Sequence, residues 1–123
     1  MQKLAALLLA LVSSSAYAET YLCVAEAGAV VEDSQGSITA GVVNVSQRKY
    51  LLTNEGGKWV VKELGMDAPF FDECPSPYFC ERADGYAGTF FRSRSTGVFT
   101  IVWLTQNKGA NEIVVAKGKC SKL

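Results

Sequence analysis

The chain contains no histidine, and this absence excludes several kinds of catalytic and metal-binding site. Without histidine there is no Ser-His-Asp triad, no Cys-His nucleophile pair and no histidine ligand for a metal. The sequence also has no Cys-x-x-Cys pair, no glycine-rich phosphate loop and no calcium-loop pattern. We therefore expect no catalytic residue, no metal site and no cofactor, and we predict that the protein is not an enzyme.

Carboxylates are the remaining source of hydrolytic chemistry. Five acidic residues in the loops of the middle third of the chain could supply the acid and base of a glycosidase: Asp67, Asp72, Glu73, Glu81 and Asp84. Acidic residues in loops are far more often solvated than catalytic, because geometry rather than number makes such a site. A small acid-catalysed hydrolase is therefore the alternative that a compact acidic pocket would favour.

The longest apolar stretch, residues 4–12, is too short for a stable membrane-spanning helix. Lys3 precedes it, and the small-x-small sequence Ala-Tyr-Ala at residues 16–18 follows it, which is the pattern of a signal peptide. We predict that residues 1–18 are removed. Residues 19–123 then form one exported domain, periplasmic or secreted, without an integral membrane segment.

The four cysteines of an exported domain are most simply two disulfides, since the compartment is oxidising. Three pairings are possible. We favour Cys74 with Cys80, because the Pro-Ser-Pro sequence between them forms a turn, which leaves Cys23 for Cys120. The second bridge would join the first strand to the last and stabilise the fold by roughly 4 to 5 kcal/mol. A zinc site is the alternative use of four cysteines, but the ligand spacing and histidines that it needs are missing.

Charge is balanced over the whole chain, with 12 basic and 12 acidic residues, but it is unevenly distributed. Residues 19–84 carry five basic and eleven acidic side chains, whereas residues 85–123 carry six basic and one acidic. No basic surface dense enough for nucleic acid follows, so we expect no nucleic-acid partner. We expect the acidic part to pair with the basic part across the same sheet.

A C-terminal hairpin is the best-defined structural unit in the sequence. In residues 97–105 both alternate sets of side chains are largely apolar, which predicts a central strand. In residues 111–117 apolar side chains occur at alternate positions, and lysines follow. This pattern predicts a strand that becomes more exposed to solvent towards its end. Glycine-containing turns separate the other predicted strands, at residues 20–26 with an extension over 29–31 past a bulge, 38–45, 49–53, 58–64 and 86–92.

These seven or eight short strands, at regular spacing and without a helical window after the signal peptide, predict an all-β domain. Almost every connection is short enough to join neighbouring strands. We therefore expect a small antiparallel meander that closes into a barrel, with a sandwich as the alternative, and that is filled by side chains. We expect residues 72–81 to be a small loop closed by a disulfide.

Several segments of the predicted domain are characteristic when taken together: Lys-Tyr-Leu at 49–51, Trp-Val-Val-Lys-Glu-Leu-Gly at 59–65, Pro69-Phe70, Phe79-Cys80 after Cys74, and Gly-Lys-Cys-Ser-Lys-Leu at 118–123. In these segments the chain resembles a family of small exported proteobacterial proteins of unassigned function. The resemblance implies an exported small domain and transfers no active residue.

A second resemblance concerns architecture. Tyr21-Leu22-Cys23 near the start and Cys120 near the end are similar to the outline of periplasmic inhibitors of c-type lysozymes. Those inhibitors are small antiparallel barrels in which an early Tyr-x-Cys cysteine is bridged to a late one. The resemblance implies, as an alternative function, an inhibitor of lysozyme or of another hydrolase.

Two surface features are candidates for binding a partner. Arg92 and Arg94 flank a predicted hairpin tip, where two guanidinium groups could bind a carboxylate or phosphate, although solvated arginines on a turn are the simpler interpretation. An aromatic group could line a sugar-binding or peptide-binding face, although core filling is the stronger interpretation for most of its members: Phe70, Phe71, Tyr78, Phe79, Tyr86, Phe90 and Phe91.

The sequence therefore predicts a non-catalytic binding module that recognises a protein or envelope component through its loops. Its candidate partner-binding residues are Arg92, Arg94 and Tyr78. A hydrolase and a purely structural envelope protein are the alternatives from other classes.

Overall fold

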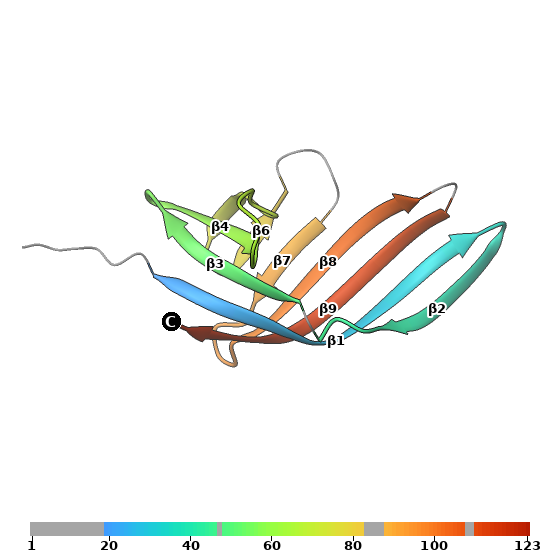
Figure 1. The fold of residues 1–123 in the computed structure, drawn as a ribbon, viewed down its shortest axis with the longest axis horizontal. Helices are drawn as coiled ribbons and strands as arrows, with labels where there is room; N and C mark the ends of the chain where they lie inside the picture. The colour runs from blue at the N-terminus through green and yellow to red at the C-terminus, as the bar shows by residue number, and fades with distance from the viewer. Residues whose placement is uncertain (1–18, 47, 83–87, 108–109) are drawn as a thin grey trace, which may run out of the picture.

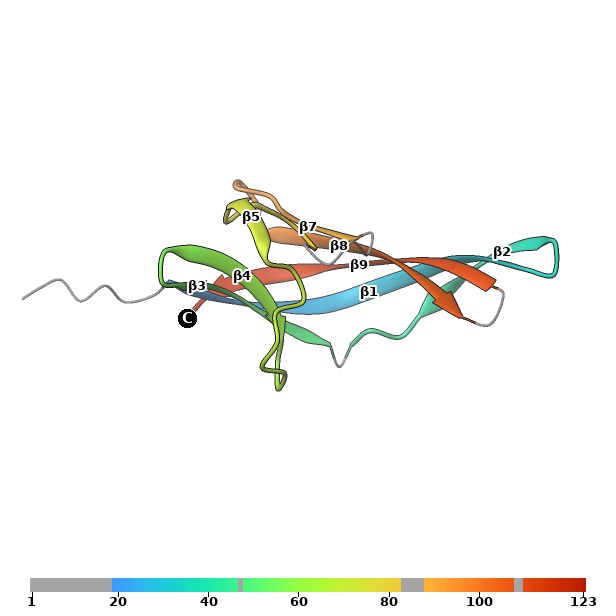
Figure 2. The same ribbon diagram turned by 90° about the horizontal axis from the view of Figure 1, so that it is seen from above.

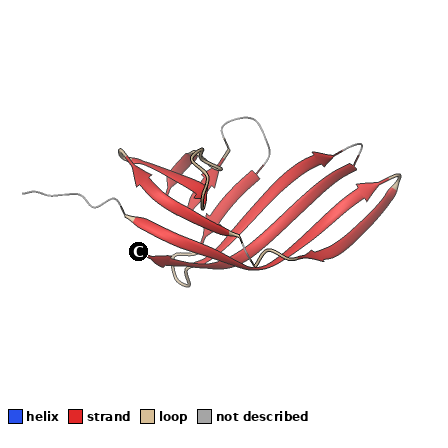
Figure 3. Ribbon diagram, in the orientation of Figure 1, coloured by secondary structure: helices blue, strands red, loops and turns tan. Residues whose placement is uncertain are grey.

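A single antiparallel sheet of nine strands curves into a nearly closed barrel in the computed structural model of this protein (Figure 1). The structure describes residues 19–46, 48–82, 88–107 and 110–123. These residues form strands and the turns between them, without a helix (Figure 3). Among them, no helix has the length and apolar character needed to cross a membrane. The predicted signal peptide, residues 1–18, lies outside the described residues.

The strands follow one another along the chain with short connections. They are β1 (Thr20–Ser34), β2 (Ser37–Val43), β3 (Lys49–Glu55), β4 (Lys58–Glu63), β5 (Glu73–Ser76), β6 (Phe79–Glu81), β7 (Gly88–Arg92), β8 (Val98–Asn107) and β9 (Ala110–Lys122). Their order in the sheet is β4-β3-β1-β9-β8-β7-β6-β5, and β2 pairs only with β1.

This order confirms the predicted meander, in which the first and last strands are neighbours. The two ends of the path approach each other where an isolated bridge joins Val61 of β4 to Phe71, just before β5. The strand count exceeds the predicted seven or eight because β5 and β6 form a hairpin within residues 72–81, which we expected to be a loop. The Cys74–Cys80 bridge holds these two short strands together.

Both predicted disulfides are present. Cys23 of β1 lies directly opposite Cys120 of β9 and is bonded to it, so the start and end of the domain are joined. Cys74 is bonded to Cys80, and the described residues include no free cysteine. Two disulfides are consistent with an oxidising environment.

Strand β1 is longer than predicted, because Gly28 does not end it. The strand continues to Ser34, and its register with β9 shifts once, between Ala25 and Ala27. A side chain at position 28 would come within 2.8 Å of Val45, so the glycine allows β1 to pass close to the segment after β2. The bulge that we expected near Gly28 is therefore a few residues earlier, and the strand continues beyond it.

An extension projects beyond the barrel because of the length of β1. The second half of β1, the whole of β2 and the adjoining ends of β8 and β9 run out together, away from the start of β1 and from the C-terminus (Figures 1 and 2). A two-residue turn with positive φ at Gln35 (53°) and Gly36 (82°) joins β1 to β2. The molecule therefore has a nearly closed barrel at one end and an open, twisted sheet at the other.

The C-terminal hairpin is central, as predicted, because β8 lies between β7 and β9. Phe99 and Ile101 of β8 are fully buried, whereas Leu104 on its other face is 43% exposed. For β9 the prediction describes one face only. Lys117 and Lys119 are exposed, as expected, but Ala116 and Gly118 on the other face are buried, since the later part of β9 lies in the barrel wall.

Aromatic rings fill the barrel. Tyr50, Phe71, Phe90 and Phe99 are fully buried, and the ring centroids of Phe90 and Phe99 are 5.9 Å apart in a stacked arrangement. Tyr50 meets Phe99 edge-on at 6.1 Å. Core filling is thus the correct interpretation for Phe71 and Phe90. Phe91 is an exception, since it is 54% exposed on the outer face, and Tyr86 lies outside the described residues.

The expected pairing of the acidic part of the chain with the basic part is not seen in the described ion pairs. Arg48 pairs with Glu63 at 3.6 Å, and Lys62 pairs with Glu55 at 2.6 Å, so both pairs lie within the N-terminal part. The two parts meet along β1 and β9, where Glu32 lies opposite Glu112 and the basic residues of β9 lie opposite uncharged ones.

Candidate functional site

The turn between β7 and β8, residues 93–97, is closed and held by backbone hydrogen bonds. Its backbone is closed by hydrogen bonds from the Ser93 N–H to the Val98 carbonyl (2.9 Å) and from the Gly97 N–H to the Ser93 carbonyl (3.1 Å). Gly97 has a φ of 74°, which favours glycine, and its carbonyl accepts a hydrogen bond from the Cys120 N–H (2.9 Å). The disulfide-bonded end of β9 therefore holds the turn in place.

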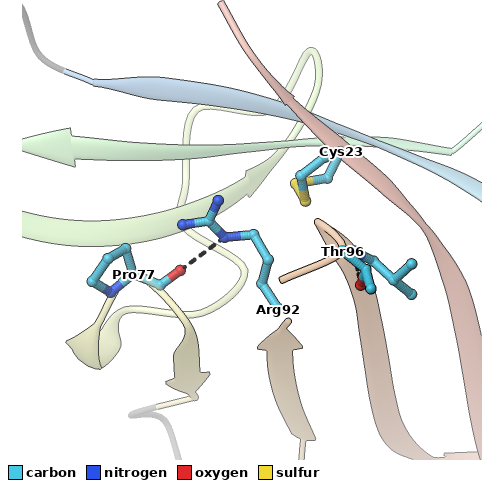
Figure 4. The surroundings of a disulfide bond; sticks show 6 residues. Cys23, Pro77, Arg92 and Thr96 are labelled. Carbon is cyan, nitrogen blue, oxygen red and sulfur yellow. Dashed lines mark hydrogen bonds between the residues drawn. A yellow bond between two sulfur atoms is a disulfide. The ribbon is translucent and has the colours of Figure 1, made fainter. Parts of the chain in front are cut away.

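Arg92, at the end of β7, is an arginine on the core side of its strand. Only 7% of it is exposed, and its Nε donates a hydrogen bond to the Pro77 carbonyl at 3.3 Å (Figure 4). Its guanidinium carbon lies 4.0 Å from the ring centroid of Tyr21 and 4.5 Å from that of Tyr78. The cation is thus stabilised by two aromatic rings and a carbonyl oxygen.

Arg94 extends this arrangement to the surface. Its guanidinium carbon lies 4.3 Å from the Tyr78 ring centroid, and the residue is exposed. The structure therefore brings together the three predicted partner-binding residues and adds Tyr21. We call the group of Tyr21, Arg92, Tyr78 and Arg94 the arginine–tyrosine stack.

The arginine–tyrosine stack carries two positive charges that the described ion pairs do not neutralise. Neither Arg92 nor Arg94 takes part in those pairs, which involve Arg48 and Lys62. Nη2 of Arg92 is buried and makes no hydrogen bond among the described residues. Arg94 differs from Arg92 because it is exposed, with its guanidinium over the Tyr78 ring. The planar fork of N–H donors of an arginine matches a carboxylate or phosphate.

Tyr21 is the member of the stack that sequence reasoning missed. A signal for it exists, since Tyr21 lies two residues from Cys23 and therefore on the same side of β1, the side that faces the barrel interior. Arg92 likewise shares its strand side with the buried Phe90. A cation and a tyrosine at inward positions of two strands predict a buried contact only once the strand order is known.

A hollow of about 310 Å³ lies where the extension leaves the barrel, and the sequence analysis did not anticipate it. The residues that line it are Val30, Val43, Asn44, Val45, Arg48, Trp103, Thr105, Glu112 and Val114. Its charged groups already have partners within the protein. Arg48 pairs with Glu63 and lies 5.8 Å from the Trp103 ring, and Glu112 accepts a hydrogen bond from Thr105 at 3.2 Å.

Tyr50, close to this hollow, is a buried titratable group whose hydroxyl affects the pH dependence of stability. Burial raises the pKa of Tyr50 above its ordinary value of 10.0, and the nearby Arg48 guanidinium opposes this effect. A group with a raised folded-state pKa contributes stability that is fully present below the unfolded value and is lost as the pH rises above it. The contribution of Tyr50 is therefore lost above about pH 10.

We predict that Tyr50→Phe removes this alkaline contribution. The free energy of unfolding of the unsubstituted protein should fall more steeply between pH 9 and pH 11 than that of the variant. Only the unsubstituted protein has a Tyr50 whose ionisation stabilises the unfolded state in this range. Urea unfolding of both proteins across this range measures the difference. Parallel curves for the two proteins would show that burial does not perturb this hydroxyl.

Among the described residues, the loop carboxylates do not gather into the compact acidic pocket that would favour a hydrolase. Glu73 of β5 lies opposite Glu81 of β6, but both are exposed, as is Asp67. A general acid of a glycosidase needs an apolar, buried setting, which these exposed groups do not have. Asp72 is half-buried, and Asp84 lies outside the described residues. Among the described residues no group of histidine, cysteine and acidic side chains could hold a metal ion.

Comparison of the chain with protein-family models, with curated proteins and with solved structures gives no match. The two resemblances drawn from the sequence therefore stay predictions.

Proposed function

We propose that this protein is an exported, non-catalytic binding module that recognises an anionic group on a protein or envelope component. The site is the arginine–tyrosine stack together with the turn at residues 93–97. The observation that carries the proposal is Arg94, an exposed guanidinium 4.3 Å from the Tyr78 ring centroid, beside a hydrogen-bonded turn. The ligand chemistry that fits it is a carboxylate or a phosphate.

Preorganisation is the physical reason that Arg94 is suited to binding. An arginine on a flexible loop loses rotamer entropy when it binds, whereas Arg94 is already restrained by Tyr78 and by the closed turn. The buried Arg92 contributes in two ways. It packs against Tyr78 at 4.5 Å and so fixes the ring, and it adds a second positive charge in a region of low dielectric.

Export is part of the proposal and rests on two supports. The first 18 residues have the pattern of a signal peptide. The two disulfides need an oxidising compartment to form and persist. We place the protein in the periplasm or outside the cell.

An inhibitor of a c-type lysozyme is a specific form of this function. The Cys23–Cys120 bridge is the one that the resemblance to such inhibitors implies. Lysozymes also present two carboxyl groups in their cleft, which an arginine at the tip of a hydrogen-bonded turn could bind. A c-type lysozyme is therefore included as a defined probe in the binding experiment.

We predict that replacing Arg94 weakens partner binding at least tenfold. The oxidised protein serves as bait for envelope and culture-fluid extracts and for a c-type lysozyme, and captured proteins are titrated individually. Arg94→Gln removes the charged hydrogen bonds to the partner, which are worth about 1.5 to 3 kcal/mol. Lys58→Gln is the matched control, because Lys58 is an exposed cation in another hairpin and its loss changes the net charge equally.

The two variants separate the possible outcomes. Loss of a saturable partner with Arg94→Gln and its retention with Lys58→Gln support the proposed site. Equal weakening by both variants would indicate attraction by net charge alone, and equal retention would place the binding surface elsewhere. A protein that captures no partner and does not bind lysozyme contradicts the binding-module proposal.

A further inference from the structure

The free edge of β2 is the least protected strand edge among the described residues. Strand β2 pairs with β1 on one side only, and it runs along the rim of the extension (Figure 1). Its sequence, Ser-Ile-Thr-Ala-Gly-Val-Val, contains no charged residue and no proline. Soluble proteins normally place a lysine, a proline or a bulge on such an edge to prevent pairing with another chain. Strand β2 has none of these features, so nothing in its sequence prevents another strand from pairing with its free edge.

Apolar side chains accompany this edge. Ile38 is 78% exposed and Val42 is 92% exposed, and together with Ala40 they lie on the outer face of the strand. The same face continues over the neighbouring strands through Val31, at 46%, and Ile113, at 42%. A shallow hollow of about 210 Å³ on this face is lined by Ile38, Val31 and Ile113 among others.

The register of the hairpin decides which backbone groups are free. The two-residue turn at Gln35 and Gly36 closes on the pair Ser34 and Ser37, which exchanges hydrogen bonds as the pair next to such a turn does. Hydrogen-bonded positions alternate along an antiparallel strand, so the odd-numbered residues of β2 bond to β1. The N–H and C=O groups of Ile38, Ala40 and Val42 therefore point away from β1, to the free edge.

We propose that β2 pairs with β2 of a second copy of this chain, antiparallel, about a two-fold axis at Ala40. In this register Ala40 lies opposite the partner's Ala40, and Ile38 lies opposite the partner's Val42. All three outward-pointing residues then exchange backbone hydrogen bonds, about six in total. The two sheets become one continuous sheet across the axis.

Self-complementarity is the reason that the occupant is a second copy. A two-fold axis requires the strand to present matching groups in both directions, and Ile38 and Val42 are β-branched apolar residues placed symmetrically about Ala40. Each would cover the exposed surface of the other as a cross-strand pair. No charge is brought against a like charge. On the inner face, Gly41 lies opposite the partner's Thr39. Because glycine has no side chain, this face also leaves room for the pairing.

The interface is small, which sets the expected affinity. A single pair of seven-residue strands buries less than the roughly 1,600 Å² of a standard interface. We therefore expect a reversible dimer with a dissociation constant in the micromolar range. Sedimentation velocity of the oxidised protein between about 1 and 500 μM should show the mass doubling with concentration.

Position 40 offers a test that is specific to the axis. Ala40→Lys and Ala40→Glu each place two like charges directly opposite one another, so each variant alone should stay monomeric at all these concentrations. An equimolar mixture of the two variants places opposite charges there and should dimerise again. Position 40 is exposed in the monomer, so neither variant should lose its fold, which circular dichroism verifies.

Two controls complete the experiment. Leu104→Lys changes the same outer face and the same hollow as Ile38, but Leu104 lies on β8, which β1 and β9 separate from β2, so the variant should leave the backbone pairing and the dimer intact. Arg94→Gln should also leave it intact, because the dimer does not depend on the proposed function. A native protein that stays monomeric at 500 μM, a mixture that fails to dimerise, or a dimer that Leu104→Lys abolishes while Ala40→Lys does not, would each overturn the proposal.

Discussion

Replacing Cys23 and Cys120 together by alanine should lower the free energy of unfolding by about 4 to 5 kcal/mol. The bridge joins residues 97 positions apart, so it closes almost the whole domain into one loop in the unfolded state. The loss is a large part of the 5 to 15 kcal/mol that stabilises a typical domain. Urea unfolding of the oxidised native protein and of the double variant measures it.

The second disulfide supplies the control for this experiment. Cys74 and Cys80 are six positions apart, and the same loop-entropy argument gives about 2 to 2.5 kcal/mol for their bridge. The variant lacking Cys74 and Cys80 should therefore be the more stable of the two double variants by roughly 2 kcal/mol. Equal losses in the two variants would contradict the idea that closure between the first and last strands is the main stabilising constraint.

Replacing Gly118 by alanine should destabilise the protein by at least about 3 kcal/mol. Gly118 is buried on β9 opposite Ala25, next to the bulge of β1. A Cβ atom at position 118 would overlap the Val24 carbonyl oxygen and lie 2.8 Å from the Ala25 Cα atom. Both atoms belong to the backbone, so β1 and β9 would have to move apart in the barrel wall.

Gly41→Ala is the matched control for the glycine prediction. Gly41 also lies within a strand, but a Cβ atom there meets nothing within 4 Å. The substitution should change the free energy of unfolding by no more than about 1 kcal/mol, because it creates no clash in the folded state and alanine restricts the unfolded chain. Equal effects at positions 118 and 41 would contradict the close approach of β1 to β9.

Much of the fold follows from local sequence signals. Alternating apolar residues, glycine-containing turns and the Pro-Ser-Pro segment between Cys74 and Cys80 predict the main strands, the meander and the disulfide pairing. The extension of β1 could not be predicted in this way. A glycine at position 28 is compatible with a strand end, a bulge or a close approach, and only the position of Val45 in space decides among them.

The direction of burial along β9 shows the same limit. Two lysines near the end of the strand, Lys117 and Lys119, indicate a solvent-exposed surface. Ala116, directly before the first of them, is nevertheless fully buried. Pairing with β1 places the later part of β9 in the barrel wall, so its small residues face the interior and its lysines face outward. An alternating pattern of residues shows which side chains share a face of the strand. It does not show how much of the strand lies in the barrel wall.

The candidate site was predictable in its residues but not in its form. The sequence indicates Arg92 and Arg94 as surface residues at a hairpin tip and Tyr78 as part of an aromatic group, whereas in the structure Arg92 is buried and lies between two tyrosine rings. Tyr21 could not be included because it lies on the first strand, which reaches the end of β7 only when the barrel closes. Contacts between distant strands are therefore the part of a site that single-sequence patterns do not reveal.

The most direct test of the account is whether the Arg94 guanidinium binds an anion. Correlation spectra of the arginine Nε–Hε groups would be recorded by NMR while inorganic phosphate or acetate is added to the oxidised protein. We predict a saturable shift of the Arg94 signal, with little change in the signal of Arg48, which already pairs with Glu63. An Arg94 signal that does not move, or that moves no more than that of Arg48, would contradict the proposed binding site.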